Sequence, residues 1–144
     1  MATGIQVVID CADPERLSEF WAAALGYRLA DPPPGFASWQ AFLESRNIPE
    51  SDWNSASAVV DPDGKGPRFY FQRVPEAKAV KNRLHVDLAV TGGPSAPLDQ
   101  RRTQAQAESR RLQTLGAREL STNEDWRGFS IVMQDPEGNE FCLH

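Results

Sequence analysis

The sequence predicts an α+β fold in which two tandem βαβββ modules form a partly open, cup-shaped mixed sheet. The predicted elements run strand, helix and three strands, and then repeat this order. The residues that end the helices and form the turns repeat as well. A Leu-Gly pair ends each helix, at 25–26 and 115–116, and an Asp-Pro-x-Gly turn at 61–64 recurs at 135–138. With 40% hydrophobic and 24% charged residues among 144, the composition is typical of one domain with its own core.

The first module is expected at about residues 4–74. Its helix follows Asp13, a good N-cap, has Pro14 at the first helical position and ends at Gly26. A triple proline at 32–34 stops the next strand, because proline cannot continue a ladder or a helix. The first strand is apolar and β-branched, which predicts a central position in its sheet. Strands are expected at 4–10, 27–30, 57–60 and 68–74.

An insertion at residues 36–56 interrupts the first module. One face of a short predicted helix there carries Trp39, Phe42 and Leu43. That helix ends near Asn47, and one further turn follows it. We expect the insertion to form a lid or a dimer surface.

The second module is expected at about residues 84–144. Its helix, at 98–115, is polar, and the residues at 121–125 predict a loop. Two arginine pairs, at 101–102 and 110–111, are interpreted as a solvated helix face because Glu and Gln residues lie between them. Strands are expected at 84–90, 117–120, 129–134 and 139–143.

The charge balance limits the possible partners. A net charge of −5 opposes nucleic acid or an anionic membrane surface and favours a small molecule or a protein. The chain runs from Met1 directly into a strand without a leader-like segment, so we expect a cytoplasmic protein. In that compartment Cys11 and Cys142 are expected to be reduced thiols. No phosphate-binding glycine loop, Ser-His-Asp order or paired-cysteine motif is present.

Nearly the whole chain resembles the glyoxalase-like branch of the vicinal oxygen chelate superfamily, most clearly in VIDCADPERLSEFWAAALGY, FYFQRVPEAKAVKNRLHVDLAV and DPEGNEFCLH. That superfamily includes glyoxalase I, extradiol dioxygenases, and fosfomycin and bleomycin resistance proteins. The resemblance implies the paired modules, a ligand pocket on the concave sheet face and a homodimer. It leaves the reaction open, because one scaffold hosts many unrelated functions.

The resemblance also assigns four positions to the metal ligands of metal-dependent members. They correspond to Gln6, Gln72 (or Tyr70), His85 and Cys142 in this sequence. Only His85 has the usual ligand type, and a neutral carboxamide replaces imidazole or carboxylate poorly. We therefore expect the usual metal site to be lost, with no metal and no other cofactor.

A different metal site stays open as an alternative. Glu140, Cys142 and His144 project to one face of the last strand, as His85 and Asp87 do on theirs. Such a His, Cys and carboxylate set is of the kind that binds zinc.

His85 is the most informative single residue. With Asp87 two residues on, it is expected to be the catalytic acid or base of the pocket, the alternative being a structural core histidine. Trp126 lies on a loop from which it could reach over the concave face. The residues expected to bind substrate are Gln6, Gln72, His85, Asp87, Trp126 and Cys142.

Three functions follow from these residues. The first is metal-independent binding of, or acid–base chemistry on, an apolar or aromatic small molecule with His85 as the titrating group. The second is a divalent-metal-dependent lyase, isomerase or dioxygenase. The third is a non-catalytic binding, regulatory or resistance-type sequestering module.

Overall fold

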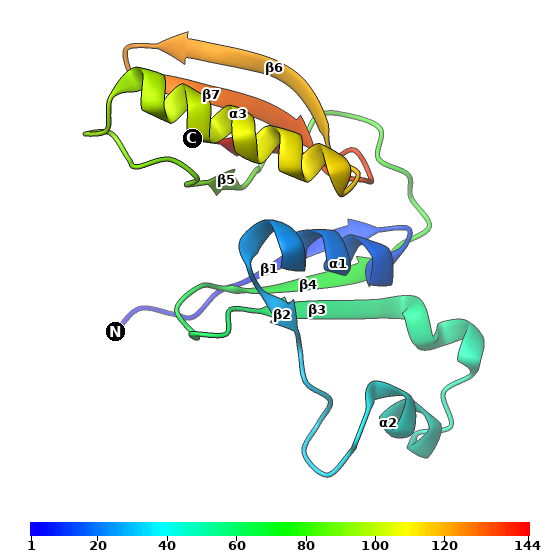
Figure 1. The fold of residues 1–144 in the computed structure, drawn as a ribbon. Helices are drawn as coiled ribbons and strands as arrows, with labels where there is room; N and C mark the ends of the chain where they lie inside the picture. Colours follow the sequence, from blue (N-terminus) through cyan, green and yellow to red (C-terminus); the bar gives the residue numbers. More distant parts are fainter. The chain divides into compact units, whose positions relative to one another are not determined.

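The computed structural model describes residues 1–144, which form two units, Met1–Ala77 and Lys78–His144. Each unit contains a four-stranded mixed sheet with one long α-helix packed on one face (Figure 1). The α+β class and the two tandem βαβββ modules are therefore confirmed. The cup that the modules would form together and the division at 4–74 and 84–144 within a single domain stay predictions.

The first unit has its strands in the order β1-β4-β3-β2, with β1 parallel to β4 and the other pairs antiparallel. The side chain of Asp13 caps α1 by accepting the backbone N–H of Arg16. The helix ends at Gly26, whose φ of 68° is a left-handed conformation that favours glycine. The elements are β1 (Gln6–Cys11), α1 (Pro14–Leu25), β2 (Arg28–Leu29), α2 (Trp39–Ser45), the 3-10 helix η1 (Glu50–Ser55), β3 (Ala56–Val60) and β4 (Arg68–Arg73).

The core of the first unit lies between α1 and one face of its sheet. Trp21 of α1 is buried and stacks on Phe69 of β4, with ring centroids 5.7 Å apart. Phe71 is fully buried on the same face, two residues further along β4. The opposite face, which we call the first open face, carries Gln6, Val8, Asp10, Tyr70 and Gln72.

One prediction for this unit is wrong. The first strand is not central in its sheet, because β1 pairs only with β4 and lies at the edge. Its apolar run resembles a strand covered on both faces. Within this unit only one side is covered, and Val8 is half-exposed on the other.

The second unit has the strand order β5-β8-β7-β6. β5 runs parallel to β8, and α3 packs on the face that holds Ile131, Met133 and Phe141. The opposite face, the second open face, carries Asp87, Val132, Gln134, Glu140 and Cys142. The elements are β5 (Asp87–Leu88), α3 (Leu98–Thr114), β6 (Arg118–Asp125), β7 (Gly128–Gln134) and β8 (Glu140–Leu143). None of the chain's helices has both the length and the apolar character needed to cross a membrane.

Two predictions for the second unit need correction. The strand expected at 84–90 is only Asp87–Leu88, although backbone pairing with the last strand extends from Val86 to Val90. Residues 121–125 belong to β6 rather than to a loop. Their polar composition is typical of a loop, but β6 is an edge strand with exposed side chains, where polar residues are well accommodated.

Candidate functional site

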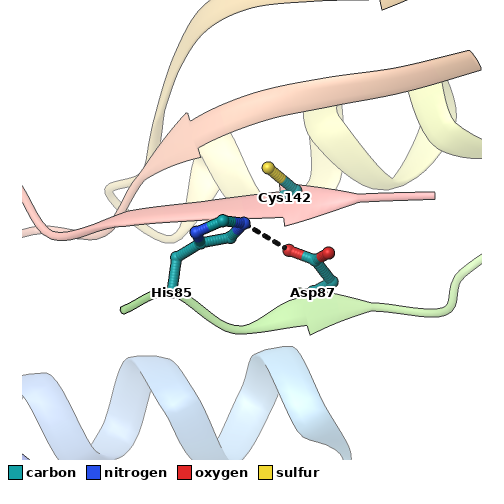
Figure 2. Close-up of side chains that lie close together, drawn as sticks. All are labelled: His85, Asp87 and Cys142. Carbon is teal, nitrogen blue, oxygen red and sulfur yellow. Dashed lines mark ion pairs between the residues drawn. The ribbon is translucent and has the colours of Figure 1, made fainter. Parts of the chain in front are cut away.

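Three side chains of different chemistry meet on the second open face: His85, Asp87 and Cys142 (Figure 2). Asp87 and Cys142 are direct partners in the parallel β5–β8 pair, so their side chains lie on the same face. His85 lies two residues before Asp87, in the extended segment that leads into β5. One imidazole nitrogen, one carboxylate oxygen and the thiol sulfur lie within 4.8 Å of one another.

The imidazole and the carboxylate form an ion pair when the histidine is protonated. His85 Nε2 lies 3.1 Å from Asp87 Oδ1, and both side chains are accessible, with 42% and 50% of their surface exposed. The His85 side chain is therefore accessible in this structure. The pair has the arrangement of a general acid or base whose ring is oriented by a carboxylate.

Cys142 adds a thiol to this pair. Burial raises the pKa of the Cys142 thiol above its usual value, and the negative charge of Asp87 and the hydrogen bond to it raise the pKa further. The sulfur is therefore protonated at neutral pH, unlike an activated nucleophilic cysteine. The three residues together offer nitrogen, oxygen and sulfur donors, a set that suits a borderline metal such as zinc once the thiol has lost its proton.

Glu140 lies on the same face but is engaged elsewhere. Its carboxylate accepts the backbone N–H of Asn82 at 2.9 Å and pairs with Lys78 Nζ at 3.2 Å. Desolvation opposes its ionisation, but these contacts and a hydrogen bond from Gln134 lower the pKa of Glu140 to about 2. In the alternative metal set, Asp87 rather than Glu140 is the carboxylate near His85 and Cys142.

The other predicted binding residues belong to other elements of the chain than this cluster does. Gln6 and Gln72 are on the first open face, at opposite ends of the β1–β4 pair. Gln6 is in register with Arg68, and Gln72 is in register with Asp10. Trp126 is in the β6–β7 turn and is 92% exposed. Trp126 precedes β7, whose first residue, Gly128, lies roughly 13 Å along the strand from Val132, the register partner of Cys142, at about 3.3 Å a residue. Their binding roles stay predictions.

The sequence interpretation missed one residue. Arg101 was assigned to a solvated helix face, but only 8% of it is exposed. The signal was in the spacing, because Arg101 precedes the buried Ala105, Ser109 and Leu112 by four, eight and eleven residues. That spacing places it on the helix face that packs against the sheet.

The model of the glyoxalase-like domain matches residues 6–144. No curated protein matches the sequence.

Solved structures resemble the fold over nearly the whole chain. The fosfomycin resistance protein FosX from Mesorhizobium loti is 14% identical, with 100% of this chain and 92% of that chain covered and a TM-score of 0.61. A FosX mutant from Listeria monocytogenes, solved with Mn(II) and a dihydroxypropylphosphonic acid, is 12% identical, with 100% and 90% covered and a TM-score of 0.63. Lactoylglutathione lyase from Agrobacterium tumefaciens is 10% identical, with 99% and 92% covered and a TM-score of 0.54. At these identities the likeness shows the fold alone.

Proposed function

The chain belongs to the family of glyoxalase-like domains, and on that premise we propose that it binds a small organic molecule on the second open face with His85 as the main polar group. The observation that carries the proposal is the accessible pair of His85 and Asp87, 3.1 Å apart. Histidine is the side chain whose ordinary titration falls near neutral pH, so an accessible, oriented imidazole suits proton transfer to or from a ligand. Asp87 acts as the positioning residue, and metal is not required.

The surroundings of the pair indicate the kind of ligand. Val132 and Cys142, which are register partners, provide an apolar surface beside His85 and Asp87 on this face. A ligand with an apolar or aromatic body and one polar group would contact both parts, as in most small-molecule sites. The ligand class that we propose is therefore an aromatic molecule with a carboxylate, phosphonate or phenol.

Replacing His85 tests this proposal. Phenylpyruvate, phenylphosphonate and catechol serve as probes, and we expect at least one of them to raise the melting temperature of the wild-type protein. His85→Ala should weaken binding of that probe at least tenfold by calorimetry, while His144→Ala, which alters the other histidine, should not. Equal affinity of His85→Ala and wild type would show that His85 is not the main polar group.

A second candidate function is that of a divalent-metal-dependent enzyme, favoured by the donor atoms of His85, Asp87 and Cys142 within 4.8 Å. Donor atoms held tetrahedrally at about 2.0–2.3 Å from zinc lie roughly 3.3–3.8 Å apart, so side-chain movements of about 1 Å would bring these three into range. A metal held there would act as a Lewis acid toward a ligand oxygen. His85 would then be a metal ligand and no longer a general base.

Metal content separates the two candidates. Protein prepared with added metal and without chelator is measured by elemental analysis, together with the melting temperature in Zn²⁺, Mn²⁺ and Co²⁺. The first candidate predicts no stoichiometric metal and no shift. The second predicts one metal per chain, a raised melting temperature and a Co²⁺–thiolate absorption band that Cys142→Ser abolishes. Because metal displaces the thiol proton, that binding should strengthen as pH rises.

The homodimer implied by the resemblance is also a proposal for this chain. Both open faces expose side chains in the single chain, among them the half-exposed Val8. Size-exclusion chromatography with light scattering should give about twice the chain mass of 16.0 kDa. A species of one chain mass only, across the micromolar range, would remove this proposal.

A further inference from the structure

The second unit contains a corner where the first turn of α3 approaches the β6–β7 turn (Figure 1). Arg101, in the first turns of α3, sends its guanidinium against Gly128 at the start of β7. A Cβ on Gly128 would lie 2.4 Å from Arg101 Nη1, so the close approach requires the absence of a side chain there. The φ of 123° at Gly128 likewise favours glycine.

Arg101 is buried at this corner, and one nitrogen of its guanidinium has no partner. Arg101 is 8% exposed, and its Nε is a fully buried nitrogen with no hydrogen-bond partner. The ion pairs of this corner join its carboxylates to Arg102 and Arg127 and not to Arg101. A guanidinium stays charged at any physiological pH, and a buried donor of it without a hydrogen-bond partner is unfavourable.

The carboxylates of the same corner are committed to other arginines. Arg102 forms ion pairs with both Asp99 and Glu124, with N···O distances of 2.7 and 2.5 Å. Arg127 forms an ion pair with Asp125, with an N···O distance of 2.5 Å. Arg101 is thus the arginine of this corner that lacks an anionic partner.

The helix terminus adds a second attraction for an anion. α3 begins after Pro97 without a side-chain hydrogen bond to its first amides. Uncapped amides and the helix dipole favour negative charge at an N-terminus. A side chain on a helix also leans toward the N-terminal end, which directs the Arg101 guanidinium to this end of α3.

We propose that Arg101 and the start of α3 form a binding site for a small oxyanion, a phosphate or a carboxylate, at the corner with the β6–β7 turn. The guanidinium fork donates two parallel hydrogen bonds to such a group, and the first amides of α3 donate others. This site is separate from the cluster of His85, Asp87 and Cys142. It requires neither a metal nor the proposed ligand of that cluster.

Anion-dependent thermal stability tests the site. Wild-type protein is melted in increasing inorganic phosphate, with chloride keeping the ionic strength constant, and in a parallel acetate series. We expect saturable stabilisation, of about 3–6 °C at a tenfold excess over Kd, in at least one series. Arg101→Met should abolish it, because the guanidinium that donates to the anion is gone.

Arg110→Met is the matched control, since Arg110 lies on the same helix but is exposed and has no ion pair. It should keep the full response to the anion. If wild type shows no saturable shift, or if Arg101→Met responds as wild type does, a water molecule rather than an anion satisfies the guanidinium and the proposal is overturned. Should Arg101→Met not fold, Arg101→Lys, which loses the planar fork, should bind at least threefold more weakly, and unchanged affinity would overturn the proposal equally.

Discussion

Replacing Trp21 with alanine lowers the free energy of unfolding by about 3–5 kcal/mol, the usual cost of truncating a buried aromatic side chain. Trp21 is 2% exposed and packs between Phe20 and Phe69, with ring centroids 5.6 and 5.7 Å away. It joins α1 to the sheet, so the variant loses apolar burial and leaves a cavity at the centre of the first unit. Urea denaturation followed by far-UV circular dichroism measures the loss.

Trp126→Ala is the matched control for this prediction. It makes the same chemical change at a position that is 92% exposed in the β6–β7 turn. We expect its effect on the free energy of unfolding to stay within about 0.5 kcal/mol. A Trp21→Ala loss below about 1 kcal/mol would contradict the packing of α1 on the first sheet.

Much of the fold could be predicted from local signals. Asp13, Pro14 and Gly26 mark the ends of α1, and the structure places that helix at Pro14–Leu25. The errors concern strands, where partners decide the outcome. The polar run at 121–125 is a strand because β7 pairs with it, and the apolar first strand is at an edge because only β4 pairs with it. Pairing depends on distant residues, which a local pattern does not contain.

The candidate site could be predicted in its composition but not in its geometry. Strand alternation placed His85 with Asp87, and Glu140 with Cys142. Asp87 rather than Glu140 joins the cluster for two reasons. The β5–β8 register places Asp87 opposite Cys142, and Lys78 and Asn82 bind the Glu140 carboxylate. The buried position of Arg101 was missed because its charge suggested a solvated face, although its spacing from Ala105 and Leu112 indicated the packed face of the helix.

Glu140 should make the protein lose stability in acid. The pKa of its carboxyl is about 2 in the folded protein, against an ordinary value of 4.5. A carboxyl with a lowered folded pKa contributes its full stabilisation above the unfolded pKa and loses it as pH falls through the folded pKa. The contribution, on the order of 3 kcal/mol, should therefore be present above pH 4.5, roughly, and disappear toward pH 2. The free energy of unfolding, measured by urea titration from pH 7 to 2, reports it.

Glu140→Gln should flatten this acid dependence, and Asp125→Asn provides the comparison. Asp125 also has a pKa of about 2, lowered by the side chain and then the backbone N–H of Arg127. Its partner Arg127 is 68% exposed, so solvent and salt screen that pair, whereas only 10% of the Glu140 side chain is exposed. Screening should therefore weaken the effect of Arg127 on Asp125 more than it weakens the contacts of Glu140, and we expect the larger loss of acid dependence in Glu140→Gln. If Asp125→Asn flattened the profile as much, the contacts of Lys78 and Asn82 with Glu140 would not be what stabilises the second unit at neutral pH.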